Sequence, residues 1–256
     1  MSSLIATAAS LLVFCAPGYP GTSGDAQPLV GEFASALGAA AGWPAGSLTA
    51  AYDANEKGDL ARLAAPEADL AFVPYPFFVE HGAELHLVPL AQADVPPAGV
   101  QQRWSLVLKT GHGPLPAALA GLTLISTAGY AQSFVRQVLQ GVGPLPGTTT
   151  ITATGQVLSA LRRAANGEPV ALLLDQEQAS ALTNLPFAAS LHNAATTPPV
   201  PVALIVIVQG RLAKPRAQEL QQALLHLSGT AAGAATLNRL RLNGFVLPRL
   251  PALPGS

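Results

Sequence analysis

The stretch with the clearest potential for chemistry is GLTLISTAGYAQSFVRQVL, residues 121–139. A short β-branched apolar run ends in the small polar turn Ser126-Thr127-Ala128-Gly129, and a helical pattern starts at Tyr130 or Ala131. A strand, a polar turn and a helix start together present free backbone N–H groups to a ligand. The polar side chains around this turn are neutral, which suits ligand binding better than bond breaking. They are Ser126, Thr127, Tyr130, Gln132 and Ser133.

Three further features could complete a ligand site. Asp175 follows the apolar run 171–174, so it either caps the next helix or contacts a ligand. His192 lies near the end of a predicted strand, and strand ends face the cleft in open α/β sheets. A set of aromatic residues would form a wall that suits a ligand with an apolar body and few polar groups. This set consists of Tyr19, Tyr75, Trp104 and Tyr130.

Composition and motifs argue against several other functions. The 256 residues carry a net charge of −1, and no basic cluster exceeds Arg162-Arg163, so we expect no nucleic-acid partner. The five histidines show no metal-ligand spacing with a carboxylate, and the single cysteine, Cys15, excludes an internal disulfide. The usual motifs of serine hydrolases, zinc proteases and phosphate-binding loops are missing. We therefore expect no catalytic residue, no metal and no cofactor.

The apolar segments of the chain are too short to cross a bilayer, which takes about 20 residues. The longest, VPVALIVIV at 200–208, has the length and β-branched character of a strand. The first fifteen residues resemble a weak export signal without a positively charged start. Because 11–15 is also needed as the first strand, with Cys15 buried in it, we expect that any export signal has already been removed.

Strand-like and helix-like patterns alternate along the chain, which predicts an α/β fold with largely parallel sheets. Asp25 is the predicted N-cap of the first helix, which ends near Gly42. The predicted strands are 11–18, 48–52, 68–75, 85–92, 100–110, 122–125, 148–154, 168–176, 187–194 and 200–209. The other predicted helices are 56–65, 77–82, 130–139, 155–167, 178–183, 215–227 and 231–242, with a helical turn in 114–122.

Two Pro-Pro pairs, 96–97 and 198–199, interrupt this alternation. They separate a middle segment from an N-terminal segment and a returning C-terminal segment. We therefore predict two lobes, the first made of 1–97 with 200–256 and the second of 98–199. Hinge crossings are expected near 94–100 and 196–201.

The order of elements resembles the periplasmic solute-binding proteins of ABC importers. The resemblance is to the phosphonate-binding, PhnD-like branch of the type-2 fold, in the PhnD/SsuA/transferrin superfamily. It extends over nearly the whole chain, although no single motif is sharp. The segments that carry it are LLVFCAPGYPG (11–21), EADLAFVPYPFFVEHGAELHLVPLAQ (67–92), RWSLVLKTGHGPLPAALAGLTL (103–124) and LNGF (242–245).

This resemblance implies two Rossmann-like lobes that close on a ligand in the manner of a Venus flytrap. Its implied contacts in the first lobe are Tyr19, Thr22, Ser23 and Tyr75. Those in the second lobe are Ser126, Thr127, Tyr130, Gln132, Ser133 and Asp175. The turn departs from the S-T-S-G anion loop of phosphonate binders, because Ala128 replaces the third polar residue.

The resemblance therefore implies a monomeric periplasmic protein that delivers a small ligand to the membrane permease of an ABC-type or related transporter. The ligand implied by the family is a phosphonate or similar oxyanion. The low charge and the aromatic wall favour instead a largely apolar or lipid-like ligand, such as a sterol. An enzyme on the same fold is the alternative from another class.

Overall fold

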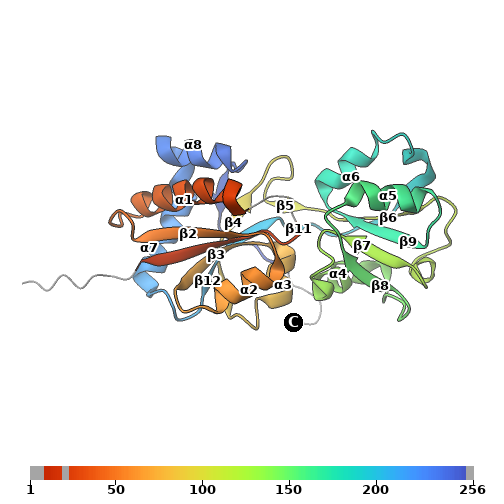
Figure 1. Cartoon of the computed structure of the whole chain (residues 1–256), viewed down its shortest axis with the longest axis horizontal. Coiled ribbons are helices and arrows are strands. Elements are labelled where there is room, and N and C mark those ends of the chain that lie inside the picture. The colour runs from red at the N-terminus through yellow and green to blue at the C-terminus, as the bar shows by residue number, and fades with distance from the viewer. Residues whose placement is uncertain (1–8, 19–22, 252–256) are drawn as a thin grey trace, which may run out of the picture.

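The computed structural model describes residues 9–18 and 23–251, which form two α/β lobes lying side by side (Figure 1). Lobe 1 contains a six-stranded sheet in the order β13-β4-β12-β3-β1-β2, and lobe 2 a five-stranded sheet in the order β10-β6-β9-β7-β8. The predicted architecture of two α/β lobes joined by two strands is thus confirmed.

Lobe 1 is a mixed sheet covered on both faces. Its strands are β1 (Ser10–Cys15), β2 (Leu48–Asp53), β3 (Ala68–Pro74), β4 (Leu87–Asp94), β12 (Ala203–Val208) and β13 (Gly244–Val246). The first three pair in parallel, whereas β12 runs antiparallel between β3 and β4. Helices α1 (Ser23–Ala40), α7 (Lys214–His226) and α8 (Ala231–Arg239) bury their apolar stripes against one face of the sheet. On the other face lie α2 (Glu56–Ala64) and α3 (Tyr75–His81).

Lobe 2 repeats this plan in a smaller form. Its strands are β6 (Ser105–Lys109), β7 (Thr123–Ser126), β8 (Thr150–Ala153), β9 (Val170–Leu174) and β10 (Leu191–Thr196). Strands β7, β8 and β9 are parallel, while β6 and β10 continue the sheet in antiparallel pairing. Helix α4 (Gln132–Val138) packs on one face and α5 (Val157–Ala165) on the other, and α6 (Gln176–Leu182) follows β9. Single 3-10 turns lie at Ala117–Leu119, Gln140–Val142, Ala188–Ser190 and Leu227–Gly229.

The lobes are linked by two short strands, β5 (Gln101–Gln102) and β11 (Val200–Pro201), which pair antiparallel. Directly beside them the Thr197 hydroxyl accepts a hydrogen bond from the Trp104 backbone N–H at 2.9 Å. The Thr197 carbonyl accepts another from the Arg103 guanidinium at 2.9 Å. The crossings are thereby tied to each other. We propose the predicted boundaries, 97/98 and 199/200, as the limits of the two lobes.

Several predicted elements differ from those observed. Asp25 lies inside α1 and is not its N-cap, and the predicted long strand 100–110 is broken between β5 and β6. The helix predicted after the polar turn starts only at Gln132. Strand β13 was not predicted, because three residues carry too little pattern and their pairing with distant β4 defines the strand.

Asp59 of α2 is fully buried against the lobe 1 sheet, next to the Cys15 thiol at the end of β1. Cys15 is buried in its strand as predicted. Burial raises the pKa of the Asp59 carboxyl to about 8, and the adjacent thiol offsets only part of that effect. Neither Asp59 oxygen has a well-formed hydrogen bond among the described residues. This carboxyl is therefore mainly protonated at neutral pH.

The raised pKa of Asp59 predicts how its substitution changes stability with pH. Between about pH 4 and pH 8 the unfolded chain releases this proton while the folded protein keeps it, so the free energy of unfolding falls as pH rises. Because asparagine does not titrate, Asp59→Asn removes this decrease in the free energy of unfolding. We expect the thermal midpoint of the variant, measured by calorimetry, to rise progressively relative to that of the parent protein from pH 5 to pH 8.5.

Asp69→Asn on β3, a half-buried position, is the matched control for the change from aspartate to asparagine. The pH dependence of the difference is the readout. A constant offset between Asp59→Asn and the parent protein at all pH values would contradict the burial argument.

Candidate functional site

The carboxyl ends of the parallel strands of both lobes meet at the seam between the lobes (Figure 1). Pro17 follows β1, Pro74 ends β3, and Thr127 and Ala128 follow β7; all four line one small cavity in this seam. Open α/β sheets bind ligands at this position, outside the carboxyl ends of their strands. The topology therefore selects the seam as the candidate site.

This small cavity, which we call the neck, measures about 10 Å³, close to the space that one water molecule needs. Its remaining lining residues are Pro76, Gln102, Trp104, Tyr130 and Val202. Beside it Gly18 adopts a positive φ of +83°, and a Cβ there would lie 2.6 Å from the Thr127 carbonyl oxygen. The backbones of the two lobes are thus in direct contact, so a ligand can enter the neck only after the lobes separate.

An aromatic cluster continues the seam away from the neck. Phe134 of α4 packs edge-on against Tyr75 of α3, with ring centroids 6.2 Å apart, and against Trp104 at 5.3 Å. The Ser133 backbone N–H also donates a 2.7 Å hydrogen bond to Glu80 across the seam. Tyr75 and Trp104, both predicted ligand contacts, are therefore buried between the lobes.

The polar atoms of these two aromatic side chains have no partner among the described residues. The Tyr75 hydroxyl and the Trp104 indole N–H are buried without a hydrogen bond, and burial raises the pKa of Tyr75 to about 12. Leaving a buried polar group unsatisfied costs about 1–3 kcal/mol. Both groups gain partners if water or a ligand enters the seam.

The polar turn after β7 uses most of its hydrogen-bonding capacity inside lobe 2. The buried Ser126 hydroxyl donates to the Leu173 carbonyl at 2.7 Å and accepts from the Ala128 N–H at 3.2 Å. The Thr127 hydroxyl accepts a long hydrogen bond, 3.4 Å, from the Gln178 amide. Gly129 lies so close to the backbone of β8 that a Cβ would overlap it. The turn is thus held mainly by its own lobe.

The five predicted residues around this turn therefore differ in position. Ser126 is buried and bonded within lobe 2. Thr127 and Tyr130 line the neck, whereas Gln132 and Ser133 lie exposed in the first turn of α4. Tyr19 and Thr22 lie outside the described residues, and of Ser23 only its place at the start of α1 is described. Their roles stay predictions.

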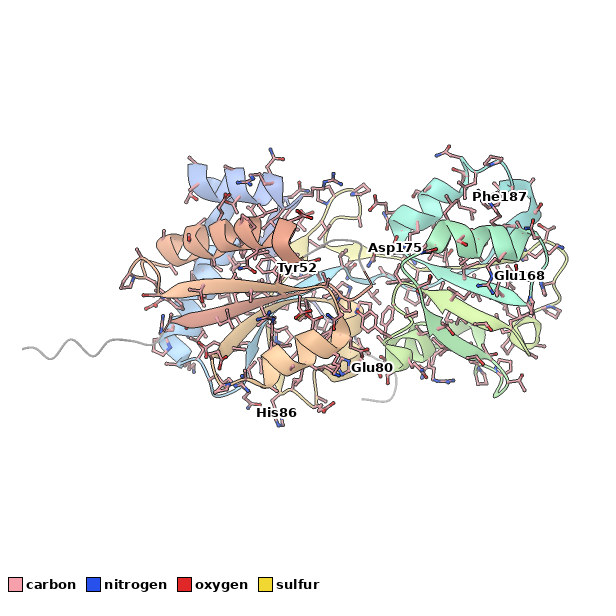
Figure 2. All side chains as sticks on the ribbon, in the orientation of Figure 1. Tyr52, Glu80, His86, Glu168, Asp175 and Phe187 are labelled. Atoms are coloured by element: carbon pink, nitrogen blue, oxygen red, sulfur yellow. The ribbon has the colours of Figure 1, made fainter. Side chains whose placement is uncertain are left out.

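Asp175 lies at the edge of lobe 2 that faces lobe 1, across from Tyr52 (Figure 2). It is the N-cap of α6: its carboxylate accepts from the Gln178 N–H at 2.8 Å, and the Gln178 side chain accepts from the Asp175 N–H at 3.3 Å. Burial raises the pKa of Asp175. Of the two alternatives, helix cap or ligand contact, the structure shows the cap.

His192 is placed away from the seam, which corrects the prediction. It pairs with Leu108 in the antiparallel β10–β6 ladder, whereas the end of this ladder nearest the seam is Thr196 with Ser105. The predicted strand, 187–194, put His192 near its carboxyl end. The observed strand is Leu191–Thr196, so Thr196 is its carboxyl end at the seam and His192 lies near its start, toward the far end of the sheet.

Two larger cavities flank the neck, and the sequence predicted neither of them. The first, which we call the α5 pocket, measures about 510 Å³. It is lined by Gly18, Thr127, Gly155, Gln156, Val157, Leu158, Ser159, Arg162 and Gln178. The second, which we call the apolar hollow, measures about 310 Å³. It is lined by Phe14, Cys15, Ala16, Tyr52, Phe72, Pro74, Val95, Val202, Ala203, Leu240 and Leu242.

These two cavities adjoin the neck through shared lining residues. Another cavity, of about 530 Å³, lies beside the crossing strand β5; it is lined by Gln92, Val100, Gln101, Leu225, Phe245, Val246, Leu247 and Arg249. A cavity of about 620 Å³ lies between the end of α1 and α7, remote from the seam. Within the described ranges, no three side chains of His, Cys, Asp or Glu come together as metal ligands would. Within the same ranges, no helix has the length and apolar character of a bilayer span.

Comparison with known proteins gives the fold. No protein-family model and no curated protein sequence matches this chain. Among solved structures, XAC2383 from Xanthomonas citri bound to chloride superposes with a TM-score of 0.70 at 14% identity, covering 96% of this chain and 93% of that protein. PhnD1 from Prochlorococcus marinus, in complex with methylphosphonate, gives a TM-score of 0.61 at 14% identity, with coverages of 94% and 93%.

A third structure, a binding-protein component of an ABC phosphonate transporter from Pseudomonas aeruginosa, gives a TM-score of 0.58 at 15% identity. It covers 93% of this chain and 81% of that protein. At these identities the similarity concerns the fold and not the ligand. The chain has the two-lobed fold of the type-2 periplasmic binding proteins, including that of the phosphonate-binding ones.

Proposed function

We propose that this protein is a non-enzymatic solute-binding protein. It captures a small ligand between its lobes by movement about the β5–β11 crossing. The observation that carries the proposal is the meeting of the parallel-strand ends of both lobes at one seam, with a cavity on each side of the neck. Contacts from both lobes are complete only when the lobes are closed, so ligand binding stabilises closure.

The proposal includes delivery of the ligand to the membrane permease of an ABC-type or related transporter. Two structures of the same fold are described as a phosphonate transporter component and a methylphosphonate complex, which supports this role and a periplasmic location. The protein works as a monomer in this proposal, since each lobe supplies half of the site.

Two classes of ligand are supported by different parts of the site. A phosphonate or other oxyanion is the class suggested by proteins of the same fold, and Arg162 in the α5 pocket would attract it. The apolar hollow instead favours a largely apolar or lipid-like ligand. The polar turn adds little to anion binding, because the Ser126 hydroxyl already has partners within lobe 2.

An enzyme on the same fold would need a reactive group at the seam. The single cysteine of the chain, Cys15, supplies a thiol near the seam. Burial and the neighbouring Asp59 raise the pKa of this thiol well above its ordinary value. A thiol with a raised pKa is protonated at neutral pH and is a poor nucleophile. This supports a binding protein over an enzyme that uses Cys15.

Ligand capture can be tested on the purified protein by native mass spectrometry and small-angle scattering. We expect either a bound mass that is released on unfolding, or a smaller radius of gyration when a ligand from a panel of alkylphosphonates, fatty acids and a sterol saturates the protein. A protein with no bound mass and an unchanged radius of gyration with every member of the panel would contradict the proposal.

Removing the hydrogen bond across the seam should favour the open protein. The Glu80 carboxylate accepts from the Ser133 N–H, and a hydrogen bond to a charged group contributes about 1.5–3 kcal/mol. We expect Glu80→Ala to shift the ligand-free equilibrium toward open lobes about tenfold or more. A larger radius of gyration, with a thermal midpoint within about 2 °C of the parent protein, is the predicted result.

Glu84→Ala is the matched control, since Glu84 is exposed just after α3. It should leave the radius of gyration unchanged. Equal radii for Glu80→Ala, Glu84→Ala and the parent protein would show that this hydrogen bond does not hold the lobes together.

A further inference from the structure

The three cavities of the seam follow one another along a single stretch of chain. Phe14, Cys15 and Ala16 line the apolar hollow, Pro17 lines the neck, and Gly18 lines the α5 pocket. The neck also shares Pro74 and Val202 with the hollow, and Thr127 with the α5 pocket. The neck therefore adjoins both larger cavities. An extended chain covers at most about 14 Å from residue 14 to residue 18, which limits the distance between these lining residues.

The apolar hollow offers almost nothing to a charged group. Phe14 and Phe72 stack at its wall with ring centroids 5.3 Å apart, and Leu240 and Leu242 close it from the end of α8. None of the described residues lining it carries a charge at neutral pH, and burial raises the pKa of the Tyr52 phenol, so that it stays neutral. A charge placed there would lose its hydration without compensation.

The α5 pocket has the opposite character. Arg162 is the one charged side chain among the described residues lining it, and Gln156, Ser159 and Gln178 add neutral polar groups. Arg162 is exposed, and its guanidinium lies 5.9 Å from the centroid of the Phe187 ring, which is not part of the pocket lining. The pocket also faces the first turn of α5, whose N-cap residue makes no side-chain capping bond. An oxyanion is the complementary ligand group.

An independent observation comes from the neck between these cavities. Trp104 lines the neck and is 3% exposed, and its indole N–H has no partner among the described residues. This group can only donate a hydrogen bond. A ligand oxygen that reaches the neck after the lobes have moved apart would satisfy it.

From this arrangement we infer that the ligand is an amphipathic oxyanion, with its acidic head group in the α5 pocket and an apolar tail in the hollow. The inference rests on the proposed function and names its ligand class. It accounts for both cavities at once. A small phosphonate would leave the hollow unused, whereas a neutral lipid would leave Arg162 without an anionic partner.

The test is a series of ligands that separates head from tail, measured by calorimetry on the full chain. The probes are octylphosphonate and octanoate as complete ligands, methylphosphonate and acetate as heads alone, and octan-1-ol as a tail alone. Each buried methylene contributes about fourfold in affinity. We therefore expect at least one complete ligand to bind about 100-fold tighter than its own head group and than octan-1-ol.

Variants then assign each end of the ligand to its cavity. Arg162→Gln should weaken the complete ligand about tenfold and leave octan-1-ol unaffected. Its control is Arg163→Gln, which removes the neighbouring arginine of α5 that is paired with Glu168 at 2.7 Å. Leu240→Gln should reduce the gain from the tail and spare the head group, while Leu250→Gln, at an exposed position near the chain end, should change neither.

The outcomes distinguish this inference from the function on which it rests. If a complete ligand and its head group bind with equal affinity and both reduce the radius of gyration, the amphipathic ligand is overturned. The proposed function, a solute-binding protein, then stands with a small anion as its ligand. A second outcome is that octan-1-ol binds tightly, that Arg162→Gln does not change its affinity, and that an acidic head group adds no affinity. This outcome would overturn the amphipathic ligand in favour of a neutral apolar ligand. If no probe binds and the radius of gyration never changes, both proposals fail.

Discussion

The packing of Phe134 against Tyr75 and Trp104 is the interaction on which the rest of the site depends. Among the described residues, two short strands connect the lobes, and such a connection alone would leave their relative position poorly fixed. The aromatic cluster joins the cores of both lobes into one apolar cluster that runs through the seam. The sizes of the neck and of its flanking cavities are therefore set by this contact, since their walls come from both sides.

The same contact carries an energetic conflict. Burying three aromatic rings stabilises the closed arrangement, whereas the unpartnered Tyr75 hydroxyl and Trp104 N–H favour an arrangement in which water reaches them. The two effects are each of the order of a few kcal/mol and oppose each other. A small difference between open and closed states is what lets the binding energy of a ligand decide between them.

The sequence allowed the architecture to be predicted because alternating strands and helices, and the Pro-Pro pairs at the crossings, are local patterns. It could not predict the apolar hollow, whose walls come from β1, β2, β3, β12 and the segment after α8. Local pattern also does not show what a polar side chain bonds to. Ser126 and Asp175 stand where a ligand contact is expected, yet a carbonyl of β9 and a helix start are their partners. His192 was misplaced because the local pattern puts the strand at 187–194, whereas pairing with β6 starts it at Leu191 and leaves His192 near its beginning.

The absence of a side chain at Gly18 allows a close approach of the two lobes at one point. A Cβ there would lie 2.6 Å from the Thr127 carbonyl oxygen, so a methyl group would require the backbone on one side of the seam to shift. A single position in the loop after β1 thus acts as a spacer for a seam that extends through three cavities. Because Gly18 also lines the α5 pocket, a side chain at this one position would change both the approach of the lobes and the wall of that pocket.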